Sequence, residues 1–374
     1  MRVCLFILFL ERRMCMELSE ITRPGVGQYI SQPGALTFLD SSIQLFKQPL
    51  IITGDKAYHA FNKFYPQGRR YSVLFYDQSA SHENIESLVN NAPSGTDLII
   101  GVGGGKALDT AKGVANKLQV EYVMIPTVLG TCAACTPLSV IYHPDHTFKT
   151  VDYYPKAAFL TIVDTDLLIE SPLKYLQSGI GDTLAKWYEA IALAEKLPLP
   201  WSTTIALGLS SAQLSRETLL NDGAKAIESI QSKQLSDAFQ RIVDTIFLIA
   251  ASVGGFAGSY GRIAGAHAVH NGLTLLPETA SIEHGVKVAY GILVQIATLG
   301  NREELNTLLP FYHANHFPTT LKQLGVTEDL PNKISQVATY AASNNESFIL
   351  AKPDLTADDI IKGMTYLENL ASRT

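Results

Sequence analysis

The protein has little cysteine, no cluster of positive charge and no long hydrophobic run. Only four cysteines occur among 374 residues, at positions 4, 15, 132 and 135. They are too few and too unevenly placed for a disulfide framework, which indicates a reducing compartment and favours a cytoplasmic protein. The net charge is −6 without a basic run, which argues against nucleic acid as a partner. A hydrophobic share of 47% suits a soluble globule of two domains.

The N-terminus carries one short apolar run, residues 3–10. Its eight residues are too few to span a bilayer. Glu11-Arg12-Arg13 follows at once without a small-residue cleavage site, so the segment fits a signal peptide poorly. We predict no membrane partner. We expect residues 1–15 to be a disordered tail, or an extension from an upstream start, outside the folded domain.

From about residue 47, short apolar runs alternate with helical stretches. Strands are predicted at residues 49–53, 71–76, 98–100, 122–125 and 160–163, with a hairpin formed by residues 140–142 and 148–150. The gaps between the first four leave room for crossover helices, as in a parallel sheet covered on both faces. After Pro172 the strand signals stop and amphipathic helices follow.

This pattern predicts an α/β, Rossmann-like dinucleotide-binding domain over residues 16–172 and an all-helical domain over residues 173–374. A small-ligand site is expected in the cleft between them.

A glycine turn follows the predicted strand at residues 98–100, in Ile-Gly-Val-Gly103-Gly104-Gly105-Lys106. Glycines let a backbone approach a pyrophosphate, and the N-terminus of the following helix offers unpaired N–H groups. The turn is neither a G-x-G-x-x-G nor a Walker A motif. A tight turn without a ligand would leave the same pattern.

The two cysteines in Cys132-Ala-Ala-Cys135 have the spacing of half a zinc ribbon or of a redox pair. No second pair exists to complete a zinc site, so we interpret them as two small thiols in a loop.

A histidine cluster lies in Gly265-Ala-His267-Ala-Val-His270 and Glu283-His284-Gly285. In a helix, His267 and His270 share one face because they are three residues apart. With a carboxylate from elsewhere, such as Asp182, which we expect to open a helix, they suit a divalent metal. Scattered ordinary polar histidines are the alternative.

Together these motifs resemble those of the iron-containing (group III) alcohol dehydrogenase superfamily, which has a dehydroquinate synthase-like fold. Within it the chain is similar to the glycerol dehydrogenase branch, close to its hydroxycarboxylate dehydrogenase-like members. The resemblance extends from about residue 18 to the C-terminus. It is carried by Gly-Gly-Gly-Lys-x-x-Asp-x-Ala-Lys112, Ile125-Pro-Thr127, Leu138-Ser-Val-Ile-Tyr142, Gly181-Asp182, Ala266-His-Ala-Val-His-Asn-Gly-Leu273 and His284-Gly285.

The resemblance implies that Asp182, His267 and His284 bind one divalent metal. Many members carry a further histidine where this chain has Lys186, and the glycerol dehydrogenase branch lacks it too. Two histidines and a carboxylate suit catalytic Zn²⁺, our first choice, and also Fe²⁺. His270 matches a position near the nicotinamide, where it would relay a proton or orient its neighbours, with simple packing as the alternative.

The resemblance also implies the cofactor residues. The pyrophosphate turn corresponds to Gly103, Gly104, Gly105 and Lys106. Asp109 is expected to start the helix that follows and to face the same region. The adenosine and nicotinamide ribose correspond to Thr127, Thr131, Leu138 and Tyr142. Asp55 matches an acidic residue on the adenosine ribose, which favours NAD, with NADP possible because Lys56 is adjacent.

One departure bears on the substrate. Where glycerol dehydrogenases carry an aspartate that approaches the polyol hydroxyls, this chain has Cys132. Loss of that anion lessens repulsion toward a carboxylate, so a 2-hydroxy acid/2-oxo acid pair is expected.

Three alternatives stay open. They are a true glycerol or vicinal-diol dehydrogenase, a dehydroquinate-synthase-like lyase, and a non-catalytic descendant. The family's habit implies a homo-oligomer.

Overall fold

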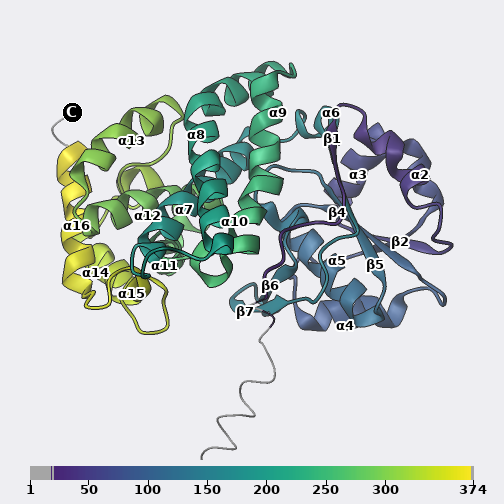
Figure 1. Ribbon diagram of the computed structural model, residues 1–374, viewed down its shortest axis with the longest axis horizontal. Helices are drawn as coiled ribbons and strands as arrows, with labels where there is room; N and C mark the ends of the chain where they lie inside the picture. Colours follow the sequence, from purple (N-terminus) through teal and green to yellow (C-terminus); the bar gives the residue numbers. More distant parts are fainter. Residues whose placement is uncertain (1–17, 19–20, 372–374) are drawn as a thin grey trace, which may run out of the picture.

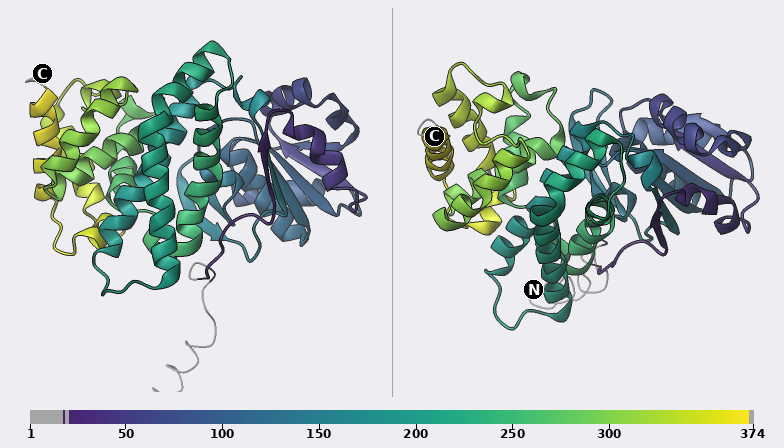
Figure 2. Two further views of the ribbon diagram at one scale, coloured as in Figure 1. Left: turned by 45° about the horizontal axis from the view of Figure 1, so that its top comes forward. Right: turned by 90° about the horizontal axis from the view of Figure 1, so that it is seen from above.

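The computed structural model describes residue 18 and residues 21–371, and in this part of the chain a sheet and a group of helices occupy opposite ends of the molecule (Figure 1). The two further views separate the same halves (Figure 2). The expected α/β N-terminal part and all-helical C-terminal part are thereby confirmed. The tail predicted at residues 1–15 lies outside the described residues.

The sheet contains six parallel strands in the order β1-β8-β5-β4-β2-β3. The strands are β1 (Tyr29–Gln32), β2 (Pro49–Thr53), β3 (Ser72–Phe75), β4 (Leu98–Gly103), β5 (Glu121–Pro126) and β8 (Leu160–Asp164). In the centre, β4 pairs with β5 from Leu98 opposite Glu121 to Gly103 opposite Pro126. The inner strands are buried on both faces, which is why each reads as a continuous apolar run.

The strand β1 was not predicted from the sequence. This strand lies at an edge of the sheet and pairs only with β8, from Tyr29 opposite Thr161 to Gln32 opposite Asp164. Its four residues, Tyr-Ile-Ser-Gln, are partly buried or exposed, and they form neither a long apolar run nor an apolar–polar alternation.

Helices cover both faces of the sheet. Figure 1 shows α2 (Leu39–Ser42) and α3 (Asp55–Phe64) on one face, with α4 (His82–Asn91) and α5 (Gly105–Leu118) on the other. A short helix, α6 (Thr165–Leu168), follows β8. The expected hairpin is present as an antiparallel pair, β6 (Leu138–Tyr142) and β7 (Phe148–Tyr153).

Beyond the last strand the described chain is helical. Its helices are α7 (Leu173–Ala194), α8 (Thr203–Ser232), α9 (Asp237–Asp244), α10 (Ala250–Ala257), α11 (Gly265–Leu273), α12 (His284–Thr298), α13 (Arg302–Ala314), α14 (Leu330–Ala341), α15 (Phe348–Ala351) and α16 (Ala357–Ala371). The helix α7 packs against both α8 and α12, and α12 packs against α11.

One helical segment of the described chain, Asp237–Gly261, is long and apolar enough by composition to cross a membrane. It comprises α9, a π-helical turn at Thr245–Ile249, α10 and the short turn that follows. Half of its most apolar window is buried inside the protein, and α10 packs against α8. Packing within the helical half therefore accounts for its apolar composition.

Two glycines allow α7 and α12 to cross in close contact. A Cβ on Gly285 would lie 1.8 Å from the carbonyl oxygen of Ser178, and one on Gly181 would lie 2.2 Å from the carbonyl oxygen of Gly285. The N–H of Gly285 donates to Ser178 Oγ at 2.9 Å. Because Asp182 follows Gly181 and His284 precedes Gly285, this contact brings the two side chains together.

Substitution Gly285→Ala is expected to destabilise the protein by about 3 kcal/mol or more, at the upper end of overpacking effects, because backbone rather than side chain must move. The measurement is the midpoint of urea unfolding. Gly25→Ala is the matched control, since its Cβ would meet nothing within 4 Å. Equal midpoints for the two variants would contradict the close contact.

Candidate active site

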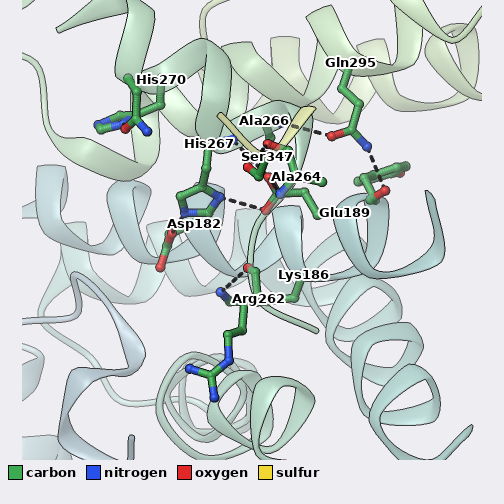
Figure 3. Close-up of polar contacts among 12 residues, drawn as sticks. Asp182, Lys186, Glu189, Arg262, Ala264, Ala266, His267, His270, Gln295 and Ser347 are labelled. Atoms are coloured by element: carbon green, nitrogen blue, oxygen red, sulfur yellow. Dashed lines mark hydrogen bonds and ion pairs between the residues drawn. The ribbon is translucent and has the colours of Figure 1, made fainter. Parts of the chain in front are cut away.

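Asp182, His267 and His284 come together from three helices. Asp182 lies in α7, His267 in α11, and His284 is the first residue of α12. The Nε2 atoms of His267 and His284 lie 3.4 and 3.2 Å from Asp182 Oδ1, and one ligand atom from each residue falls within 4.8 Å of the others. Figure 3 shows His267 pointing toward Asp182.

This donor set fits a metal ion. Donors about 2.0–2.1 Å from a tetrahedral Zn²⁺ lie about 3.3 Å apart, close to the separations observed here. The chemistry of the set, two imidazole nitrogens and a carboxylate, is that of catalytic zinc sites with an open position. The three residues named from the sequence are thus positioned to hold one divalent ion.

The expectation that Asp182 opens a helix is wrong. The helix α7 begins at Leu173, so Asp182 lies in its middle. Glycines weaken a helix in isolation, and Gly179 and Gly181 therefore look like a helix start in the sequence. In the protein they are contact points: a Cβ on Gly179 would lie 2.0 Å from the carbonyl oxygen of Leu129, in the loop after β5.

Glu189, which the sequence analysis did not single out, holds His267. It is almost fully buried, and its Oε2 lies 2.7 Å from His267 Nδ1. Its Oε1 accepts hydrogen bonds from the backbone N–H groups of Ala264 and His267 at 2.7 and 2.9 Å. The available signal was its spacing, seven residues after Asp182 and so on the same face of α7.

Charge in this cluster is balanced by direct contacts. Burial opposes the charge on His267, but Glu189 and Asp182 raise the pKa of its ring to about 9. Burial likewise opposes ionisation of Asp182, but hydrogen bonds from the two imidazoles hold its pKa well below the usual value. The carboxylates therefore remain ionised acceptors, as metal binding requires.

His270 is buried beside the cluster. Its Nε2 lies 3.0 Å from His284 Nδ1, and its Nδ1 lies 3.0 Å from Asn271 Oδ1. The structure thus places it against a metal-ligand candidate. Its role as a catalytic residue stays a prediction.

The glycine turn lies where it was expected, between β4 and α5. Gly103 ends β4 with φ +153°, and a Cβ there would lie 2.6 Å from the Cβ of Ala107. The N–H of Thr127 donates to the Gly103 carbonyl at 3.0 Å, and Thr131 Oγ1 would lie 3.3 Å from a Cβ on Gly105. Thr127 and Thr131 are therefore gathered around the N-terminus of α5.

Other predicted cofactor residues flank this turn. Asp55 is exposed and opens α3 just after β2, the strand next to β4. Lys106 lies with Nζ 4.5 Å from the centre of the Tyr142 ring. Leu138 begins β6 and is partly buried. Strand ends at this edge of a parallel sheet are where nucleotides bind in such folds.

Asp109 differs from its predicted place. The helix begins at Gly105, so Asp109 lies in the second turn and is buried. Its Oδ1 pairs with Lys112 Nζ at 2.7 Å, and its Oδ2 accepts from the N–H of Val140 at 3.1 Å. The carboxylate is directed at β6, because the buried ammonium of Lys112 holds it there.

Lys112 was quoted in the sequence motif without a role, and the structure supplies one. Its fully buried Nζ donates to the carbonyl oxygens of Ala133, Thr136 and Leu138, the first two at 3.0 and 3.3 Å. It therefore holds the loop that carries Thr131 and Cys132.

Cys132 lies between the cofactor turn and the metal-ligand candidates. It opens a short 3-10 turn capped by Thr131, and its thiol is close enough to Lys186 and Asp182 to feel both charges. Burial raises the pKa of the Cys132 thiol, and Lys186 only partly offsets this. Cys132 and Cys135 are both free thiols, consistent with two small side chains in a loop.

Comparisons with known proteins point to one family of enzymes. The family model "Iron-containing alcohol dehydrogenase" matches residues 27–165. Hydroxycarboxylate dehydrogenase A of Escherichia coli is 37% identical over 92% of this chain and 96% of its own length. A glycerol dehydrogenase of Thermotoga maritima is 32% identical over 89% of this chain and 93% of its own length. A probable glycerol dehydrogenase of Sinorhizobium meliloti superposes with a TM-score of 0.82 and 26% identity, covering 94% and 99% of the two chains.

Substitution Lys112→Met is expected to destabilise the protein by about 3–5 kcal/mol, because it leaves the Asp109 carboxylate buried and unpaired. Binding of NAD should weaken as well, since the loop at residues 131–138 loses its anchor. Thermal unfolding and fluorescence titration with NADH are the measurements. The double variant Asp109→Asn/Lys112→Met should recover part of the lost stability; no recovery would contradict the pairing.

Proposed function

The chain belongs to the iron-containing alcohol dehydrogenase family, and we propose that it interconverts a small 2-hydroxy acid and the corresponding 2-oxo acid with NAD. The observation that carries the proposal is a cation, Lys186, one helical turn after the metal-ligand candidate Asp182. As a family member, the protein is a metal-dependent, NAD-linked alcohol oxidoreductase.

The metal would be held by Asp182, His267 and His284, and we infer zinc ahead of iron from the two-nitrogen, one-oxygen donor set. When bound, it supplies Lewis-acid polarisation of the substrate oxygen, which lowers the pKa of a hydroxyl. Glu189 keeps His267 oriented through its Nδ1.

The cofactor would be bound at the carboxyl ends of β2, β4 and β5. Backbone N–H groups at Gly104, Gly105 and Lys106, at the start of α5, would bind its pyrophosphate. Asp55 would accept the ribose 2′-hydroxyl and repel a 2′-phosphate, so NAD is preferred over NADP. The bound nicotinamide supplies or accepts the hydride.

A carboxylate on the substrate would be paired with Lys186. Although burial disfavours its charge, Asp182 raises the pKa of Lys186, so it remains an ammonium. Its Nζ donates to the Arg262 carbonyl at 3.3 Å, a contact visible in Figure 3. A 2-hydroxy acid carries its carboxylate on the carbon that bears the reacting hydroxyl, so a cation beside the metal ligands suits it.

Cys132 supports the same substrate class. The thiol stays neutral because burial raises its pKa, so it adds no negative charge beside Lys186 and Asp182. The relative named hydroxycarboxylate dehydrogenase A agrees with this choice. A vicinal diol such as glycerol is the second candidate, because other relatives are named glycerol dehydrogenase. We further infer a cytoplasmic homo-oligomer from the family and from the small number and uneven placement of the cysteines.

Initial rates test the substrate class. We expect 2-oxobutyrate or 2-oxoglutarate to be reduced with NADH at a higher kcat/KM than that for oxidation of glycerol or 1,2-propanediol. Strong glycerol oxidation with inert oxo acids would contradict the proposal and favour the diol enzyme. Parallel assays with NADP(H) test the preference that Asp55 predicts.

Substitution Lys186→Met is expected to lower kcat/KM for the oxo acid by about 10–100-fold, the value of a hydrogen bond to a charged group. Activity on any diol should fall far less, because a diol has no carboxylate to lose. The exposed Lys156, which pairs with Glu121, provides the control variant Lys156→Met. Equal losses of kcat/KM for oxo acids and diols would show that Lys186 does not bind the substrate carboxylate.

Removal of the metal by a chelator is expected to abolish turnover without unfolding the protein, and Zn²⁺ should restore it. Metal content measured by atomic emission should be one ion per chain, lost in Asp182→Asn. Full activity in metal-free protein would contradict the metal site.

A further inference from the structure

In both histidines of the candidate metal site, His267 and His284, the Nδ1 atom is within hydrogen-bond distance of a neighbouring side chain. His267 Nδ1 lies 2.7 Å from Glu189 Oε2, and His284 Nδ1 lies 3.0 Å from His270 Nε2. A histidine whose Nδ1 carries the proton presents a lone pair at Nε2, and only a lone pair binds a metal. What fixes the proton on each Nδ1 therefore decides whether both rings are ready to bind.

In His267, the proton on Nδ1 is fixed by a direct contact with Glu189. A carboxylate offers only acceptors, so Glu189 requires a proton on His267 Nδ1. A metal that binds at the Nε2 atom facing Asp182 then has only the proton on that atom to displace.

In His284, the proton on Nδ1 is fixed less directly, through a series of hydrogen-bonded side chains that ends at Glu346. His270 Nδ1 lies 3.0 Å from Asn271 Oδ1, and Asn271 Nδ2 donates to both oxygens of Glu346, at 3.2 and 3.1 Å. Burial raises the pKa of Glu346, while the hydrogen bond from Asn271 favours its ionised form.

The direction of every hydrogen bond follows from Glu346. Its acceptor oxygens orient the amide of Asn271 with Nδ2 outward, so Oδ1 must accept from His270 Nδ1. His270 Nε2 is then an acceptor, which requires the proton of His284 on Nδ1. A metal that displaces the hydrogen bond between His284 Nε2 and Asp182 Oδ1, 3.2 Å apart, then meets the lone pair of Nε2.

We propose that Glu346, through Asn271 and His270, is a positioning residue that fixes His284 with Nε2 ready for the metal, as Glu189 does for His267. The proposal rests on the metal site inferred above. It assigns a function to Glu346, which lies 75 residues from Asn271 in the sequence. It also makes His270 an orienting residue.

The segment that carries Glu346 is fastened to the same site. Ser347 Oγ donates to the Ala264 carbonyl at 2.8 Å, and Ala264 gives its own N–H to Glu189. The next residue, Phe348, is fully buried, and its ring lies 2.6 Å from where a Cβ on Gly265 would be. The segments that carry Glu189 and Glu346 are thus both bonded to Ala264, just before α11, and Figure 3 shows Ser347, Ala264 and Glu189 together.

The test is the affinity for Zn²⁺ and Co²⁺, measured by competition with a chromophoric chelator. In Glu346→Gln an amide faces an amide, so neither orientation of Asn271 is enforced. We expect binding to weaken by about tenfold, within the 10–100-fold range of such supporting residues. Glu278→Gln, which removes a surface partner of Lys333, is the control and should bind as the wild type does.

A reciprocal exchange separates direction from simple packing. In the double variant Glu346→Gln/Asn271→Asp, the carboxylate is at position 271 and the amide at position 346. The carboxylate accepts a hydrogen bond from His270 Nδ1, and the amide donates one to the carboxylate. Affinity should return to within about threefold of the wild type, given the tenfold loss expected above. A double variant weaker than Glu346→Gln alone would overturn the proposal.

Spectroscopy gives a second readout that needs no turnover. In the Co²⁺-loaded wild type, we expect two paramagnetically shifted, exchangeable ring N–H signals, from His267 and His284. Glu346→Gln should speed exchange of one and Glu189→Gln of the other. Wild-type affinity and unchanged signals in Glu346→Gln would overturn the inference. Failure of the wild type itself to bind, or undiminished binding by Asp182→Asn, would instead reject the metal site.

Discussion

The close crossing of α7 with its neighbours is the constraint on which the rest of the site depends. Gly179 touches the backbone of the loop after β5, and Gly181 touches the backbone of α12 at Gly285. No side chain fits at either point. The first contact brings the metal-ligand helix to the cofactor half, and the second sets Asp182 beside His284. The same short stretch of α7 therefore positions both the metal and the loop that borders the cofactor.

Buried charges then make the site specific. Three buried carboxylates lie at the metal-ligand candidates and the cofactor turn. Glu189 contacts the ring of His267, and Asp182 contacts the rings of His267 and His284. Asp109 pairs with Lys112, whose ammonium donates hydrogen bonds to the loop at residues 131–138. A buried ion pair contributes little net stability, but removal of one member is strongly destabilising. Such pairs therefore hold particular atoms in place.

Much of this could be predicted from the sequence. Inner strands appear as apolar runs, and the glycine turn, Asp182, His267 and His284 were each found by local pattern. The edge strand β1, the start of α7 and the orientation of Asp109 were not. Each of these depends on a partner distant in sequence: β8 for β1, the loop and α12 for the glycines of α7, and the buried Lys112 with β6 for Asp109. Glu189 and Glu346 were missed for the same reason. The spacing of Glu189 from Asp182 puts both on one face of α7, but nothing local shows which side chains either glutamate will contact.

An anomalous-scattering map of zinc-loaded crystals, collected at the zinc edge, would locate the metal directly. We predict one strong peak per chain, about 2.0–2.2 Å from a carboxylate oxygen of Asp182 and from Nε2 of both His267 and His284. A peak coordinated through Nδ1 of His284, or a metal bound away from these three residues, would contradict it.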